Sequence, residues 1–203
     1  PSDEFLSSEI ARSKIARKER NEETVRLLRS LGYDVSYEEA ELLAGHGLVG
    51  RGHFANLLVS KGYCSSVKQA FADLLSCGKP AYSGNHCFTD REAIDIIHRA
   101  GGVAVLAHLH LIKLPDEKLY EYLKKLKGFG LDAIEGYYTD YTPEMEKTYR
   151  SFAASLGLIL SGGSDYHGSV KPHISIGTGY GDLHVPYSLL GEIRKHARSV
   201  MSV

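Results

Sequence analysis

Side chains able to bind a metal ion follow two apolar segments of the sequence. The segment 103-VAVLA-107 runs into His108, and 158-LILSGGS-164 runs into Asp165 and His167. Carboxylate oxygen and imidazole nitrogen are ligands of Mn²⁺, Fe²⁺ and Zn²⁺, and no cysteine lies near enough in sequence to offer a thiolate. An ion held by these side chains would lower the pKa of a bound water and neutralise charge on a phosphoryl oxygen. His108, Asp165 and His167 are therefore the predicted metal ligands.

The local spacing favours this interpretation. In an extended segment, residues two positions apart point to the same side, so Asp165 and His167 can face one ion. Gly162 and Gly163 are expected to let the backbone turn sharply and approach a ligand closely. The alternative is that a D-x-H pattern arises by chance and that a lone histidine at a strand end forms an ordinary hydrogen bond. Two strand ends that each supply a histidine favour the metal site.

Other polar and aromatic residues near the strand ends could be functional or structural. Glu135 follows the apolar segment 131-LDAI-134 and either binds metal, caps a helix or pairs with an arginine. His110 is either a further ligand or part of a loop that packs against the domain. Tyrosines in this region are predicted to form pocket wall or core, and the remaining histidines without supporting context are predicted to be structural. These are Tyr137, Tyr138 and Tyr141, and His46, His98, His184 and His196.

The predicted secondary structure differs between two parts of the chain. Up to about residue 80 the patterns predict helices only. Capping boxes that open helices are predicted at Ser36 and, in the next part of the chain, at Thr89, and a further cap is predicted at Thr142. From Thr89 onward, helical patterns alternate with short apolar strands, which is typical of βα units with a parallel sheet. The predicted helices cover 3–31, 36–43, 52–61, 66–76, 89–100, 116–127, 142–156 and 188–200, and the predicted strands cover 103–107, 131–138 and 158–161. In such folds the active site forms at the carboxyl ends of the strands, where the candidate ligands lie.

A second candidate site lies in the helical part. Arg51 and His53 stand at the start of a predicted helix, where free backbone N–H groups and the helix dipole favour an anion. An arginine at this position could hold a phosphate with two hydrogen bonds. A capped helix with a solvated arginine is the alternative interpretation.

Composition restricts the class of partner. The formal net charge is -1, which predicts no binding of duplex DNA, and no apolar run reaches the roughly 20 residues that cross a bilayer. The three cysteines lack metal-site spacing and are predicted to be free thiols in a reducing compartment, which favours a cytoplasmic location.

Taken together, four motifs resemble the PHP (polymerase and histidinol phosphatase) family of metal-dependent phosphoesterases. They are 101-GGVAVLAH-108, 131-LDAIEGYY-138, 161-SGGSDYHG-168, and the pair 50-GRGHFANLLVSKG-62 and 70-AFADLLSCGKPAY-82. The last pair looks like the helical insertion of one branch of that family. This branch contains nucleoside 3′,5′-bisphosphate phosphatases and a 5′-to-3′ exoribonuclease.

The resemblance implies an α/β fold, in which residues 86–203 form the C-terminal half of a distorted (βα)7 barrel and residues 1–85 form an all-helical insertion unit. It also implies that His108, Asp165 and His167 bind divalent ions, with manganese first and iron, zinc or magnesium as alternatives. Asp165 and His167 would be catalytic. The substrate would be a small phosphorylated nucleotide or short RNA end, held by Arg51, His53 and Ser164.

Two departures from the family pattern limit these expectations. Leu109 replaces the proline that follows the metal-binding histidine in the family. In addition, the D-x-H-x-H-S strand that opens the family's domain does not occur in this sequence. We therefore expect the C-terminal portion of a phosphoesterase that is incomplete by itself. Its open barrel edge would favour self-association.

Two other functions are compatible with the same residues. One is a non-catalytic module that binds phosphate without turnover. The other is an amidohydrolase-like hydrolase of substrates without phosphate, which the His108-x-His110 pair suggests. Metal content and the release of phosphate from a nucleoside bisphosphate would distinguish these alternatives.

Overall fold

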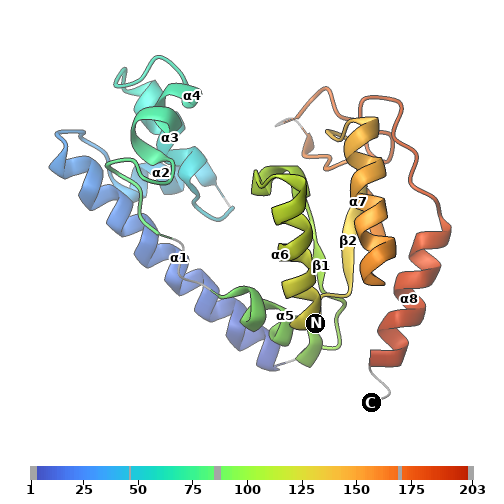
Figure 1. Cartoon of the computed structure of the whole chain (residues 1–203). Helices are drawn as coiled ribbons and strands as arrows, with labels where there is room; N and C mark the ends of the chain where they lie inside the picture. Colours follow the sequence, from blue (N-terminus) through green and yellow to red (C-terminus); the bar gives the residue numbers. More distant parts are fainter. Residues whose placement is uncertain (1–3, 46, 85–87, 169–170, 201–203) are drawn as a thin grey trace. The chain divides into compact units, whose positions relative to one another are not determined.

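The computed structural model describes residues 4–45, 47–84, 88–168 and 171–200. Its contacts divide the chain into two compact units, Pro1–Cys87 and Phe88–Val203, which are described separately (Figure 1). His46 and Cys87 lie outside the described residues, whereas Cys64 and Cys77 are free thiols, as predicted for these two. No described helix is both long and apolar enough to cross a membrane.

The first unit consists of helices in its described part, in agreement with the patterns. They are α1 (Glu4–Ser30), α2 (Tyr37–Ala44), α3 (Arg51–Ser60), α4 (Val67–Ala70) and the π-helix η1 (Phe71–Leu75). The predicted capping box is present, because the Ser36 hydroxyl accepts from Glu39 N and the Glu39 carboxylate accepts from Ser36 N. Satisfying these free N–H groups determines where α2 begins.

The core of the first unit lies between α1, α2, α3 and η1. Its largest fully buried side chains include Leu28, Phe54, Leu58 and Leu75. The buried positions of α1 are confined to its last third, between Asn21 and Leu28, so the earlier part of this helix is largely exposed. Burial of apolar area is the main force that holds these short helices together.

The second unit is an α/β structure with a parallel sheet, as the alternating patterns predicted. Its elements are α5 (Asp90–Arg99), β1 (Val105–Leu106), the 3₁₀-helix η2 (Leu109–Ile112), α6 (Asp116–Gly128), β2 (Ala133–Tyr138), α7 (Pro143–Leu156), β3 (Ile159–Gly163) and α8 (Ser188–Val200). The strands pair in the order β1-β2-β3, and both pairs are parallel. All three carboxyl ends therefore lie at one edge of this sheet, where polar side chains can meet.

Helices cover the sheet and provide its core. Helix α7 packs on β2 and β3, and α8 packs on β3. Figure 1 shows α7 beside β2. Leu119 and Leu123 of α6 and Ile134 of β2 are almost fully buried in one cluster. Since β2 is the central strand, it is the best-buried strand and the most rigid support for side chains at its end.

Two details of the sheet differ from the expectation. The first strand is shorter than 103–107, and the third continues through the glycine pair. Gly162 and Gly163 pair with Tyr137 and Tyr138, so the prediction of a sharp turn at these glycines is wrong. Position 162 requires glycine because β2 and β3 pack closely there. A Cβ on Gly162 would lie 2.7 Å from the Cβ atom of Tyr137.

A β-bulge interrupts the pairing of β2 with β3. Glu135 pairs with Ser161, whereas Tyr137 pairs with Gly162, so Gly136 is the additional residue on β2. In a regular strand, residues three positions apart point to opposite faces. The bulge changes this alternation and allows Glu135 and Tyr138 to approach the same group of side chains.

Candidate functional site

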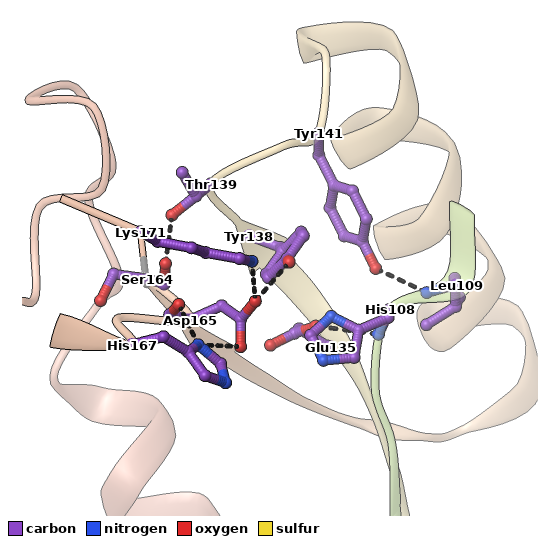
Figure 2. A network of polar contacts seen from close by, with 10 residues as sticks. All are labelled: His108, Leu109, Glu135, Tyr138, Thr139, Tyr141, Ser164, Asp165, His167 and Lys171. Carbon is purple, nitrogen blue, oxygen red and sulfur yellow. Dashed lines mark hydrogen bonds and ion pairs between the residues drawn. The ribbon is translucent and has the colours of Figure 1, made fainter. Parts of the chain in front are cut away.

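Asp165 lies at the centre of a polar network at the carboxyl end of β3 (Figure 2). Its Oδ2 atom accepts a hydrogen bond from the Tyr138 hydroxyl at 3.0 Å and another from the Lys171 ammonium. The backbone of Asp165 has a φ of 51°, in the left-handed region that non-glycine residues rarely adopt. This backbone turn, rather than an extended segment, places the carboxylate among its partners.

His167 contacts Asp165 directly. Its Nδ1 atom lies 2.7 Å from the Asp165 carbonyl oxygen and 3.3 Å from Oδ1 of the same residue. Because 53% of the His167 side chain is exposed, the ring faces solvent and can accept a ligand without rearrangement of the core. The structure therefore brings the predicted D-x-H pair together.

His108, just after β1, and Glu135, within β2, form a second pair. The backbone N–H of His108 donates to Oε2 of Glu135 at 2.9 Å, and the Nδ1 atom of His108 lies 3.6 Å from the same oxygen. His108 also has a left-handed backbone, with a φ of 55°. Within the described residues, its buried Nδ1 atom has no hydrogen-bond partner. Strained backbone and an unpaired polar atom are typical of positions that bind a ligand.

Tyr138 joins the two pairs. Its ring packs edge-on against the His108 ring, with 4.8 Å between the centroids, while its hydroxyl donates to Asp165. Figure 2 shows Tyr138, Glu135 and Asp165 converging from β2 and from the segment after β3. Tyr138 is a polar contact of the site in addition to the wall or core residue that the sequence predicted.

The charges of the site are set by these contacts. The Lys171 ammonium, and then the Tyr138 hydroxyl, hold the pKa of Asp165 below its usual range. Burial raises the pKa of Glu135, although the hydrogen bond from His108 N opposes this shift. Burial, together with the neighbouring Asp165 charge, also raises the pKa of Tyr138, so this hydroxyl remains a donor.

The three predicted ligands are divided between the two pairs. Across the described parts of the chain, no group of three or more His, Cys, Asp or Glu side chains is arranged to hold a metal ion. Asp165 with His167 and His108 with Glu135 each supply the oxygen and nitrogen donors that a divalent ion accepts. The unpaired Nδ1 atom of His108 fits a ligand role.

The remaining candidates have assigned contacts in the structure. Ser164 is buried, its carbonyl oxygen accepts from the Thr139 hydroxyl, and its own hydroxyl accepts from Gly177 N at 3.2 Å. His110 lies between the rings of Tyr138 and Tyr141, and burial lowers its pKa. His110 belongs to η2, and its buried Nδ1 atom has no hydrogen-bond partner among the described residues. The ring contacts agree with a packing role, and the unpaired nitrogen agrees with a ligand role.

Arg51 and His53 lie in the first unit, at the start of α3. The Nδ1 atom of His53 accepts from Gly50 N at 2.9 Å and so caps the helix. Arg51 donates from Nη2 to the carbonyl oxygen of Ser83, and its guanidinium lies 4.5 Å from the centre of the Tyr82 ring. The Nε atom of Arg51 is buried and has no hydrogen-bond partner among the described residues.

Sequence reasoning missed Lys171. It lies in the loop after β3, six positions beyond Asp165, and no local pattern distinguishes it from a solvated lysine. Glu135 was recognised as a candidate, but its contact with His108 depends on the pairing of β1 with β2.

Sequence comparisons show which known proteins this chain is similar to. The chain is 33% identical to the 5′-3′ exoribonuclease Rnm of Escherichia coli over 164 residues, which are 81% of this chain and 55% of that protein. It is 30% identical to the 3′,5′-nucleoside bisphosphate phosphatase of Chromobacterium violaceum over 123 residues, 59% of this chain and 42% of the relative. This chain is related to bacterial enzymes that cleave phosphoesters. The predicted resemblance to phosphoesterases of the bisphosphate phosphatase and exoribonuclease branch is thereby confirmed.

Solved structures support the same relationship. A crystal structure from Bifidobacterium adolescentis, assigned as a metal-dependent phosphoesterase, matches with a TM-score of 0.75 and 28% identity over 95% of this chain and 67% of that one. An amidohydrolase from Chromobacterium violaceum, solved with bound sulfate and no metal, shares the fold with a TM-score of 0.78 at 22% identity, over 98% of this chain and 68% of that one. No family model matches the sequence. The chain spans about half the length of the curated relatives that it matches.

Proposed function

We propose that this chain is part of a metal-dependent phosphoesterase that hydrolyses nucleotide phosphomonoesters, such as nucleoside 3′,5′-bisphosphates, or trims short RNA ends. The observation that carries the proposal is the contact of Asp165 with His167 at the end of β3, beside Glu135 and His108. The relationship to an exoribonuclease and to a bisphosphate phosphatase supports the choice of substrate class.

A divalent ion is part of this proposal. His108, Asp165 and His167 would hold it, since carboxylate oxygen and imidazole nitrogen accept divalent ions of this kind. Manganese is the first choice because the family resemblance implies it, with iron, zinc or magnesium as alternatives. The ion would neutralise charge on the phosphoryl oxygens and activate water for attack. Tyr138 would orient the Asp165 carboxylate, and Glu135 would hold the backbone of His108.

The domain assignment is also part of the proposal. Residues 1–85 would correspond to the helical insertion of the bisphosphate phosphatase branch, and residues 86–203 to the C-terminal half of its barrel. Arg51 would bind the phosphate of the substrate, since its guanidinium is preoriented by the Tyr82 ring and by Ser83. Within the first unit, His53 would support Arg51 by capping the helix that carries it. Within the second unit, Ser164 would be a substrate-binding residue held by the loop at Gly177.

The decisive experiment combines metal binding with turnover. Asp165→Asn is compared with Asp95→Asn, an exposed carboxylate of α5. Mn²⁺ binding is measured by calorimetry, and phosphate release is measured with adenosine 3′,5′-bisphosphate. Both assays use the 203-residue chain and the longest reading frame that contains it. We expect Asp165→Asn to lose both properties and Asp95→Asn to keep them. Full activity of Asp165→Asn would contradict the assignment.

A phosphate-binding module without turnover is the second candidate. It is favoured by the division of the predicted ligands into two pairs, with no group of three metal-ligating side chains in the described residues. Binding of the bisphosphate in both lengths of the protein, without release of phosphate in either, would support it over the hydrolase.

A further inference from the structure

Lys171 forms an ion pair with Asp165, a predicted metal ligand. Its ammonium contacts Oδ2, the oxygen that also accepts from Tyr138, and Figure 2 shows the lysine side chain reaching across to the carboxylate. Lys171 comes from the loop after β3, whereas Tyr138 comes from β2. Two donors on one oxygen leave little room there for a further cation.

We propose that Lys171 is an exchangeable counter-ion. It holds Asp165 while no divalent ion is bound, gives the carboxylate up when an ion binds, and then offers its ammonium to a phosphate at the same edge of the sheet. The inference rests on the proposed role of Asp165 as a metal ligand.

The burial of the two side chains supports an exchange. Only 18% of the Asp165 side chain is exposed, so a carboxylate without any cation there would be costly. The Lys171 side chain is 32% exposed and carries its ammonium on a flexible aliphatic stem, so the ammonium can move into solvent. Two cations on one carboxylate repel each other, and binding of a divalent ion therefore displaces the lysine.

Other charges near the lysine determine where the ammonium can go. Asp140, at the turn after β2, lies within electrostatic range of Lys171, and its Oδ1 atom already accepts from the Tyr180 hydroxyl at 2.8 Å. A phosphate group is a stronger acceptor than this occupied carboxylate, and a lysine binds it as a point charge. The displaced ammonium is thus suited to a phosphorylated ligand rather than a neutral one.

The first test measures Mn²⁺ affinity directly by calorimetry, without substrate. Lys171→Met removes the competing charge, Lys171→Arg keeps it, and Lys118→Met removes an exposed charge from α6 as a control. We expect Lys171→Met to bind Mn²⁺ about three- to tenfold more tightly than the unchanged protein, because it removes a partly buried ion pair. Lys171→Arg and Lys118→Met should bind Mn²⁺ like the unchanged protein.

The second test measures binding of inorganic phosphate to the manganese-loaded protein. Lys171→Met should bind phosphate about three- to tenfold more weakly, and Lys118→Met should not differ from the unchanged protein. Equal or weaker Mn²⁺ binding by a folded Lys171→Met protein, or unchanged phosphate binding, would overturn the inference. So would absence of Mn²⁺ binding in every variant, since removal of the competitor should reveal the ion site.

These readouts separate the inference from the proposed hydrolase function. Both measure binding and neither requires turnover. If Lys171→Met changes both affinities while no variant releases phosphate from the bisphosphate, the hydrolase proposal fails and the exchange stands.

Discussion

The Nε2 atom of His196 lies 2.7 Å from Oδ1 of Asp132, and this contact ties the last helix to the start of the central strand. The other carboxylate oxygen of Asp132 contacts Nε2 of His98 at 2.7 Å and accepts from Ala104 N at the same distance. One buried carboxylate thus holds α5, α8 and the segment before β1. Because Asp132 precedes β2, this network supports the sheet at the edge remote from the candidate site.

We predict that Asp132→Ala lowers the free energy of unfolding by about 2–3 kcal/mol, because it leaves buried donors without an acceptor. Urea denaturation at pH 7 measures this change. Asp95→Asn, at an exposed position, should change it by less than about 0.5 kcal/mol.

The pH dependence of the free energy of unfolding should reflect the titration of Asp132. Burial opposes the charge of Asp132, but hydrogen bonds from His98, His196 and Ala104 N outweigh it and hold its pKa below the usual range. The stabilisation is then complete above the unfolded pKa of about 3.9 and is lost as the pH falls through the lower folded value. Urea midpoints between pH 2.5 and 6 should decline less steeply in Asp132→Asn. An identical decline in both proteins would contradict the assignment.

Glu135→Gln should weaken metal binding without lowering thermal stability. Burial raises the pKa of Glu135, so its stabilising contribution is present at low pH and decreases as the pH rises through the folded value. Glutamine keeps an oxygen that can accept from His108 N and removes the buried charge. At pH 8 we expect a melting temperature equal to or above that of the unchanged protein, because the buried charge is removed. We expect Mn²⁺ affinity to be reduced about tenfold, because the negative charge beside His108 is lost. A clear loss of thermal stability would count against this account.

Neighbouring glycines of β3 should respond differently to alanine. A Cβ on Gly162 would lie 2.7 Å from Tyr137 Cβ and 2.8 Å from the Tyr137 carbonyl oxygen, whereas the nearest atom to a Cβ on Gly163 is Glu135 Oε1 at 3.9 Å. We expect Gly162→Ala to cost about 1–3 kcal/mol, since backbone atoms must move. Gly163→Ala should stay within about 1 kcal/mol of the unchanged protein. Thermal denaturation of the matched pair measures the difference.

Tyr138→Phe should weaken metal binding without loss of the fold. The change removes the hydroxyl that donates to Asp165 and keeps the ring that packs on His108. Loss of an orienting hydrogen bond to a ligand is expected to reduce Mn²⁺ affinity about tenfold. Tyr187→Phe, at an exposed tyrosine, is the control. Equal Mn²⁺ affinity of the two variants in calorimetry would show that Tyr138 does not orient the site.

Arg51→Lys should affect the phosphorylated substrate and leave the metal site unchanged. Lysine keeps the positive charge but lacks the planar group that stacks on Tyr82 and donates to Ser83. We expect about a tenfold weaker apparent affinity for adenosine 3′,5′-bisphosphate, with unchanged Mn²⁺ affinity. Arg26→Lys is the matched control, because the Arg26 side chain on α1 is 73% exposed. A parallel loss of Mn²⁺ binding would indicate damage to the fold instead.

Local sequence was sufficient for the helices and for the class of fold. The capping boxes at Ser36 and Thr89 and the cap at Thr142 form as predicted, because each depends on residues within three positions. The alternation of helices with short apolar strands likewise predicted a parallel sheet, since such strands need helices on the sheet to bury them. The D-x-H spacing brought Asp165 and His167 together because both belong to one turn.

The tertiary structure decided which side chains surround that pair. The sequence by itself determined Asp165 and His167 as neighbours, but the contact of Glu135 with His108 requires the pairing of strands 27 positions apart. The bulge at Gly136 brings Tyr138 to the same site, and the loop after β3 brings Lys171. Hydrogen bonds and ion pairs between distant segments leave no periodic trace in sequence, because either partner alone has the pattern of an ordinary exposed polar residue.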